Sequence, residues 1–272
     1  MSLNQDLEDL NNQFPLSNTT MPALFVGHGS PMNAVESNEF SRAWIDVGKT
    51  LPRPRAILCI SAHWQISAPM VTAMEKPRTI HDFGGFPREL FEYQYPAPGS
   101  PDLARLVGAL VGKTPVGLDQ AWGLDHGTWS VLCRMFPNAD VPVVQLSLDD
   151  TQPPVFHYAL GQELRTLRQR GVLILGSGNM VHNLRMAFFQ DEAYDWAIEF
   201  DQLEKKLIET GDHAALVDYA RLGKAARLAI PTNEHYLPLL YVLAVQEQGE
   251  ALRFFTDRVT LGSISMRSLI IG

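Results

Sequence analysis

Short, wholly apolar runs recur along the chain, and their composition predicts buried β-strands. The runs are rich in Val, Ile and Leu. They lack the apolar/polar alternation of a half-exposed strand, so we expect both of their faces to be covered. The clearest runs are ALFVG at 23–27, AILCISA at 56–62, VPVVQLSL at 141–148 and GVLILGSG at 171–178, with weaker ones at 70–74 and 114–119.

Between these runs, apolar residues recur at helical spacing. Strands that alternate with helices are typical of an α/β fold. We therefore expect a central, mostly parallel or mixed sheet that is flanked by helices, with one or two edge strands from the tail at 253–272. The expected helices span 36–47, 102–112, 128–136, 154–170, 195–209, 213–227 and 233–245.

One domain is expected, because no internal repeat, low-complexity tract or linker divides the 272 residues. The segment 1–20 is polar and acidic, and it lacks the basic start and apolar core of a signal peptide. We predict a flexible N-terminal leader over 1–20 and a single folded domain, which carries the chemistry, over 21–272.

Charge and cysteine content exclude several classes of partner. The net charge is −8 and no run of Lys or Arg stands out, so neither a nucleic acid nor an anionic membrane is expected as a partner. No apolar stretch approaches the roughly 20 residues of a membrane helix. The two cysteines form no disulfide framework, which favours a reducing compartment. We predict a cytoplasmic monomer or small homo-oligomer.

Four histidines lie where a ligand of an α/β protein would bind. His28, His63 and His182 come at or just beyond the end of an apolar run, and His235 opens the helix expected at 233–245. Open α/β sheets bind ligands at the carboxyl ends of their strands, and imidazole suits Zn, Fe and Cu. A metal site is therefore expected at this edge of the sheet, with His126 as a fifth candidate.

The remaining motifs are weaker. There is no Gly-x-Ser-x-Gly elbow, no HExxH and no complete GxGxxG, so neither a serine hydrolase nor a dinucleotide site is indicated. Glu234 precedes His235 directly, and adjacent residues of a helix do not share a face. On that ground we expect only one of the two side chains to point into the site.

Seven separated motifs carry a resemblance that covers the chain from about Met21 to its end. Together they resemble the LigB-like superfamily of class III extradiol ring-cleavage dioxygenases, and within it the 4,5-DOPA dioxygenase branch. The motifs, in order, are GHGSPMN, SAHW, TIHDFGGFP, YPAPGSP, WGLDHGTW, GSGNMVHNL and EHYLPLLYVLA.

The resemblance implies one divalent metal per chain, with Fe(II) expected for activity and Zn²⁺ expected as purified. By motif position, His28, His63 and His235 match metal ligands. His182 matches an active-site histidine that either ligates a resting Zn²⁺ or acts as an acid/base, and His126 matches a second acid/base position. No organic cofactor is implied.

The reaction implied is cleavage of a catechol such as L-DOPA, at the 4,5 bond, by O₂ to a ring-opened semialdehyde. The Phe83–Phe86 segment, together with Tyr93 and Tyr95, is expected to wall the site against an aromatic ring. Three alternatives stay open at this stage. They are a tetrapyrrole metal chelatase, a non-enzymatic metal-binding scaffold of the same superfamily, and a zinc-dependent hydrolase.

Overall fold

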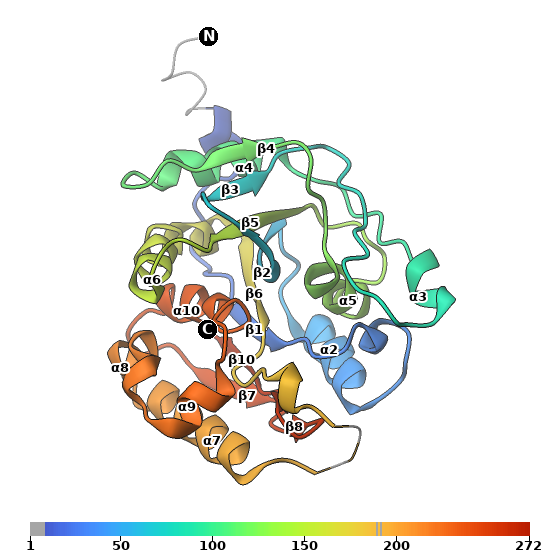
Figure 1. Ribbon diagram of the computed structural model, residues 1–272. Helices are drawn as coiled ribbons and strands as arrows, with labels where there is room; N and C mark the ends of the chain where they lie inside the picture. Colours follow the sequence, from blue (N-terminus) through green and yellow to red (C-terminus); the bar gives the residue numbers. More distant parts are fainter. Residues whose placement is uncertain (1–8, 189, 191) are drawn as a thin grey trace.

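The computed structural model describes residues 9–188, 190 and 192–272, and an eight-stranded mixed sheet forms its centre (Figure 1). β5, β2, β6 and β1 run parallel at the middle of the sheet, whereas β3, β10 and β7 each pair antiparallel with a neighbour. The order across the sheet is β4 (Gly117–Asp119), β3 (Met70–Thr72), β5 (Val143–Asp149), β2 (Ala56–Ile66), β6 (Val172–Gly178), β1 (Ala23–Gly27), β10 (Ser268–Ile271) and β7 (Leu252–Phe255).

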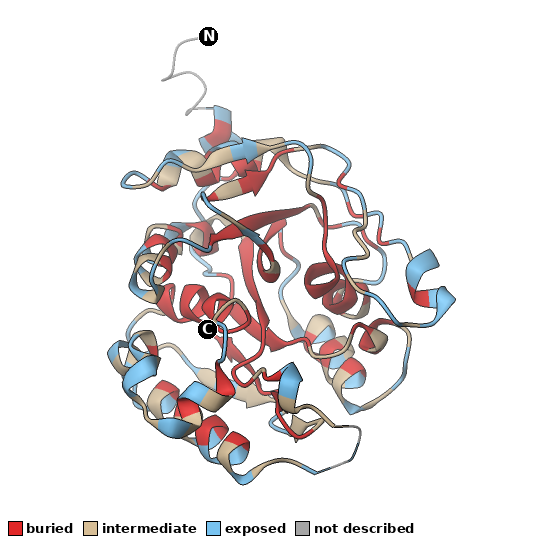
Figure 2. Ribbon diagram, viewed as in Figure 1, coloured by how far each residue is buried: buried red, intermediate tan, exposed pale blue. Residues whose placement is uncertain are grey.

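Helices cover both faces of this sheet, because alternate residues of each central strand point to opposite sides. In β1, Phe25 joins one hydrophobic cluster, while Leu24 and Val26 join the other. The first cluster packs under α4 (Pro101–Leu110), α6 (Pro154–Glu163), α7 (Asp195–Glu209) and α10 (Leu237–Ala244), and the second under α2 (Glu39–Thr50) and α5 (His126–Met135). Figure 2 shows the resulting buried centre. The predicted single α/β domain with a mixed sheet is therefore confirmed.

Smaller elements complete the description. A two-stranded sheet, β8 (Val259–Thr260) with β9 (Ile264–Ser265), lies apart from the main sheet. No helix in the described ranges is both long and apolar enough to span a bilayer. Residues 9–13 are also helical. The other helices are α3 (Arg88–Glu92), α8 (His213–Val217), α9 (Lys224–Ala229) and the 3₁₀ turns η1 (Pro31–Ala34), η2 (Arg165–Arg170), η3 (Leu184–Met186) and η4 (Tyr219–Arg221).

One prediction about the C-terminal third is wrong, and another is only partly right. The helix expected at 213–227 is broken into α8, η4 and α9, and Gly223, with φ of 99°, provides one of the breaks. The tail was expected to form one or two edge strands; β7 is an edge strand, but β10 is buried between β1 and β7. Its partners lie far away in the sequence, so local pattern could not reveal that position.

The leader predicted over 1–20 falls partly outside the described residues, which begin at residue 9. Within the described part, Leu10 and Phe14 are only 5% and 7% exposed and belong to the core cluster that Phe25 also joins. Those two side chains are therefore part of the folded body. The boundary between leader and domain at residue 20 stays a prediction.

Candidate metal centre

His28 and His63 approach each other from neighbouring parts of the sheet. His28 follows β1 directly, and its backbone N–H donates to the carbonyl of Gly178 at the end of β6 over 3.1 Å. His63 lies inside β2, at the point where the pairing with β5 shifts register between Ile60 and Gln65. This irregularity, rather than the end of the strand, turns His63 toward His28. Their Nε2 atoms are 3.1 Å apart.

His182 and His235 enter from the other side, and glycine makes their approach possible. The carbonyl of His235 accepts a hydrogen bond of 2.8 Å from the backbone of Asn179, just beyond β6. A β-carbon on Gly178 would lie 2.1 Å from that carbonyl oxygen, so a side chain there would push His235 away. The rings of His182 and His235 stack, with centroids 3.5 Å apart and planes inclined by 8°.

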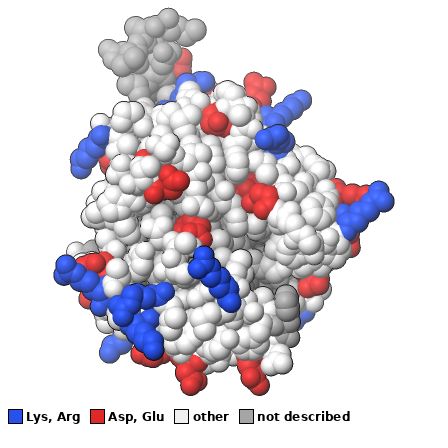
Figure 3. Space-filling view, viewed as in Figure 1, with Lys and Arg blue, Asp and Glu red and all other residues white. Residues whose placement is uncertain are grey.

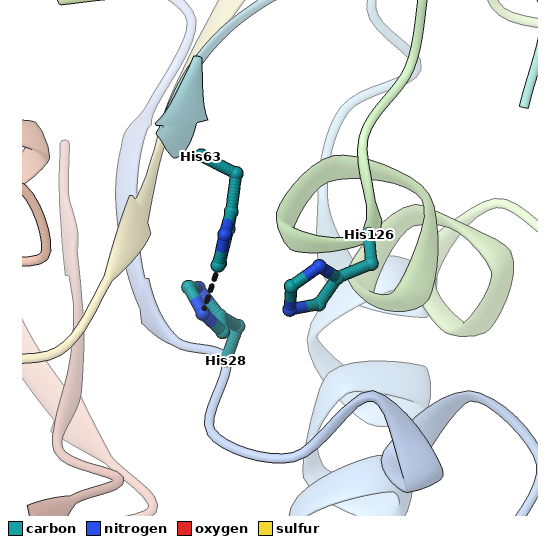
Figure 4. Close-up of side chains that lie close together, drawn as sticks. All are labelled: His28, His63 and His126. Carbon is teal, nitrogen blue, oxygen red and sulfur yellow. Dashed lines mark hydrogen bonds between the residues drawn. The ribbon is translucent and has the colours of Figure 1, made fainter. Parts of the chain in front are cut away.

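His126 is the first residue of α5, and it completes the group. Its ring centroid lies 3.9 Å from that of His63 and 5.7 Å from that of His28. Figure 4 shows these three rings converging from three separate elements. All five histidines named from the sequence line one cavity of about 820 Å³, which is within the range of small-molecule sites.

The donor set fits a divalent metal ion. One donor atom each from His28, His63 and His126 lies within 4.8 Å of the others, and the same holds for His182, Glu234 and His235. Imidazole nitrogen and carboxylate oxygen are ligands that both Zn²⁺ and Fe(II) accept. The His/Glu cluster at the carboxyl ends of the strands can therefore hold a metal ion.

Hydrogen-bond acceptors at Nδ1 orient the rings of His28 and His235 and determine which nitrogen can bind a metal. The hydroxyl of Ser177 donates to the carbonyl of Gly127 over 2.5 Å, and its oxygen lies 3.0 Å from Nδ1 of His28. Since that hydroxyl proton is already used, Ser177 must accept from Nδ1–H of His28. The lone pair of His28 is then on Nε2, which faces the cluster. His235 is held similarly, because its Nδ1 lies 3.0 Å from Oε1 of Glu234.

Burial keeps these imidazoles neutral. Desolvation, followed by the proximity of the other histidines, lowers the pKa of His28 and of His235 well below the ordinary value. Burial also lowers the pKa of His63 to about 3 and that of His182 to about 4. A metal binds only the unprotonated nitrogen, so the site is ready for a metal at neutral pH.

Of Glu234 and His235, only His235 is among the described residues that line the main cavity, which agrees with the expectation that one of the two points into the site, but the helical reason given for it is wrong. The helix begins at Leu237, so both residues lie in the turn before it, where the helical rule does not apply. Glu234 contacts His235 and also lines a smaller cavity beside His182. A turn at this place leaves no periodic signal in the sequence.

Sequence reasoning missed Asp82. Its carboxylate lies 3.0 Å from Nδ1 of His126 and 3.3 Å from Nδ1 of His63. Burial opposes its ionisation, but the contacts with His126 and then His63 outweigh it, and the pKa of Asp82 is lowered. The HDFGGFP motif was identified only as a wall of the site, and no local pattern links Asp82 to histidines so distant in the chain.

The wall of the cavity is aromatic, though not entirely as expected. Phe83 and Phe86 line it as predicted, and Phe40 and Phe188 join them. Tyr95 is instead buried in the core, where its hydroxyl donates to the carbonyl of Phe136, and Tyr93 stacks on Trp129. Neither tyrosine is among the described residues that line the cavity. Figure 3 shows basic and acidic side chains interspersed on the face in view, much of which is uncharged.

Comparison with known proteins gives the family. Residues 21–262 match the family described as the catalytic LigB subunit of aromatic ring-opening dioxygenase. A relative from Escherichia coli K12, named 4,5-DOPA dioxygenase extradiol, is 48% identical over 94% of this chain and 97% of its own length. A relative from Beta vulgaris with the same name is 37% identical over 79% of this chain and 83% of its own.

A solved structure agrees with these sequence matches. The crystal structure of an uncharacterized protein from E. coli K12 superimposes with a TM-score of 0.80 at 42% identity, and covers 93% of this chain and 100% of that protein. The resemblance read from the seven motifs is confirmed. The chain belongs to the LigB family of aromatic ring-opening dioxygenases.

Proposed function

We propose that this protein is an extradiol dioxygenase that opens the ring of a catechol such as L-DOPA with O₂. Both oxygen atoms enter the product, a semialdehyde formed by 4,5-cleavage, so the reaction needs no external reductant. The observation that carries the proposal is that five imidazoles line one cavity, whose wall is also aromatic. The names of the relatives from E. coli and Beta vulgaris support the choice of DOPA as the test substrate.

His28, His63 and His235 are the proposed anchors of the metal. Their neutral nitrogens would hold one divalent ion, with Fe(II) for activity and Zn²⁺ as the form that purification in air favours. A bound ferrous ion would supply the one-electron chemistry that lets O₂ react with an aromatic diol. The protein's own part is to bind the ring, orient it and move protons.

His182 and His126 are the proposed proton carriers. A catechol must lose protons before its two oxygens can chelate a metal, and a neutral imidazole is the natural acceptor near neutral pH. The lowered pKa of His182, caused chiefly by burial, means that it enters the reaction unprotonated. Phe83 and Phe86 stand beside these histidines, where they would hold the aromatic ring and exclude water.

The alternatives have less support. A tetrapyrrole chelatase would explain His28 but not the LigB match over residues 21–262. A non-enzymatic metal-binding scaffold would need the same oriented ligands, but it would not need a cavity of about 820 Å³ with an aromatic wall beside them. No specific observation favours zinc-dependent hydrolysis. A cytoplasmic monomer or small homo-oligomer, with neither nucleic acid nor membrane as partner, stays a prediction.

The test combines oxygen uptake with the identity of the product. The protein is loaded with Fe(II) without air and then mixed with L-DOPA in aerated buffer. We expect one O₂ to be consumed per catechol, together with a yellow ring-opened product. Simple oxidation to a quinone leaves the ring intact, and it consumes one O₂ per catechol if H₂O₂ forms or half an O₂ if water forms. That result, or no uptake after complete iron loading, would contradict the proposal.

A further inference from the structure

The carboxylate of Asp82 touches two imidazoles of the site at once. Its Oδ2 lies 3.0 Å from Nδ1 of His126 and 3.3 Å from Nδ1 of His63. Its Oδ1 accepts a hydrogen bond of 2.9 Å from the backbone N–H of His126. The side chain of Asp82 is only 18% exposed, although its backbone faces solvent. One carboxylate therefore links a proposed metal ligand to a proposed proton carrier.

Asp82 is the acceptor that faces His126. Nδ1 of His126 is buried and has no aligned hydrogen-bond partner in the described structure, and the Asp82 carboxylate, 3.0 Å away, is near enough to become that partner. The neighbouring carboxylate, Asp125, is engaged elsewhere. It accepts from the Ser61 hydroxyl over 2.7 Å and from the Gln145 amide over 2.7 Å, and it caps α5. A small rotation of either group would align His126 with Asp82.

We propose that Asp82 is a positioning residue that holds both His63 and His126 in the Nδ1–H tautomer. A neutral imidazole carries one N–H, so a proton shared with Asp82 at Nδ1 leaves the lone pair on Nε2. In His63 this lone pair faces Nε2 of His28, where the metal would sit. In His126 it is free to accept a proton from substrate. The assignment of these two roles rests on the function proposed above.

Asp82 also connects the aromatic wall of the cavity to the histidine cluster. Phe83 follows Asp82 directly, and its ring meets that of His126 edge-on at 5.5 Å. Phe83 also packs on the rings of Phe86 and Phe91, with centroids 5.4 and 5.0 Å away. The contacts of Asp82 add a polar link between the start of the Phe83–Phe86 wall and the histidine cluster.

Asp82→Asn separates this role from simple packing. Asparagine has nearly the same shape, but one of its two terminal atoms is an NH₂ donor. If the amide oxygen keeps the hydrogen bond from the His126 backbone, the NH₂ group faces two Nδ1 atoms and favours the opposite tautomer in both rings. If the amide flips, two donors meet at the His126 backbone. Glu89→Gln, at an exposed position in the first turn of the nearby α3, is the matched control.

The decisive measurement reads the tautomers directly. The full chain is labelled with ¹⁵N-histidine and loaded with Zn²⁺. Long-range ¹H–¹⁵N spectra then distinguish the two tautomers, and His126→Gln identifies the His126 signals. We expect Nδ1–H for His126 in the wild type and in Glu89→Gln, and Nε2–H in Asp82→Asn. With Fe(II), kcat on L-DOPA should fall by about 10- to 100-fold in Asp82→Asn with little change in KM.

The outcomes separate this inference from the proposed function. A wild-type His126 in the Nε2–H or the doubly protonated form overturns the inference without any variant. An unchanged tautomer in a folded Asp82→Asn protein, shown by an unchanged thermal unfolding midpoint, overturns it as well. Because the spectra need no turnover, an inactive protein with the expected tautomers would sink the proposed function and leave the role of Asp82 standing.

Discussion

Single atoms decide which nitrogen of each histidine can bind a metal. His28 presents Nε2 because Ser177 accepts at Nδ1, and Ser177 accepts because its own proton goes to the carbonyl of Gly127. Glu234 does the same for His235. Contacts of this kind orient ligands before the metal arrives, and their loss typically costs about 10- to 100-fold in affinity or activity.

The role of His182 can be tested separately from that of the three proposed metal ligands. His182→Ala leaves His28, His63 and His235 in place, so we expect metal content near that of the wild type. Turnover of L-DOPA should fall by about 10²- to 10⁴-fold, the usual contribution of an acid/base group. Metal analysis and O₂ uptake measure the two effects on the same sample.

A matched control for His182→Ala is His213→Ala. His213 lies on α8 and hydrogen-bonds to Tyr158, so its removal deletes an imidazole without touching the cavity. It should change neither metal content nor turnover. If His182→Ala loses its metal together with its activity, His182 is a structural ligand and the assignment as a proton carrier is wrong.

At the scale of elements, the site depends on how closely the end of β6 approaches the start of α10. The backbone bond between Asn179 and His235 joins them, and the missing side chain of Gly178 leaves room for it. The Gly-Ser-Gly end of β6 therefore has a packing role. It lets one histidine-bearing turn lie directly against the strand end.

Gly178→Ala should damage both stability and the site. Its β-carbon would lie 2.1 Å from the carbonyl oxygen of His235, and such overpacking costs about 1–3 kcal/mol. We expect a lower free energy of unfolding in urea and reduced metal occupancy. Gly108→Ala on α4 is the control, because its nearest contact would be an ordinary 3.6 Å and helix propensity favours alanine by up to about 1 kcal/mol. Equal stability and metal content in the two variants would refute this account.

On the scale of the whole molecule, the topology of the sheet brings the histidines of the site together. β1, β2 and β6 lie side by side and parallel, so segments that are far apart in sequence end at one edge. The five imidazoles crowd together there, and burial lowers the pKa of four of them, His28, His63, His182 and His235. Such an arrangement favours metal binding, and it makes the metal-free protein sensitive to acid.

The stability of the metal-free protein should fall as the pH drops from about 6.5 toward about 4. The pKa of His63 is lowered to about 3 and that of His182 to about 4, from the ordinary value of about 6.5 in the unfolded chain. Between these limits the unfolded chain binds protons that the folded chain excludes, so acid favours unfolding. Each imidazole adds up to about 1.4 kcal/mol per pH unit.

Urea unfolding at about pH 7 and about pH 5 checks this sign. The metal-free His182→Asn variant has one fewer buried imidazole, so its stability should depend less steeply on pH than that of the wild type. Equal slopes would show that His182 is not held neutral by burial. A gain in wild-type stability on acidification would contradict the account of the whole cluster.

Much of the secondary structure was predictable, because it follows from the local spacing of apolar and polar residues. The strand at 23–27 and the helix at 195–209 have the predicted bounds, and all five site histidines reach one cavity. What escaped prediction depends on distant partners. The interior place of β10, the contacts of Asp82 and the pairing of Glu234 with His235 all arise from tertiary packing or from turns, which leave no periodic signal.

The central claim is that the histidine cluster opens a catechol ring with both atoms of O₂. The most direct measurement is mass spectrometry of the product formed by the Fe(II)-loaded protein from L-DOPA under ¹⁸O₂, reduced at once to prevent exchange of the aldehyde oxygen with water. We predict a ring-opened product that carries two ¹⁸O atoms. A product with an intact ring and no ¹⁸O would contradict the account.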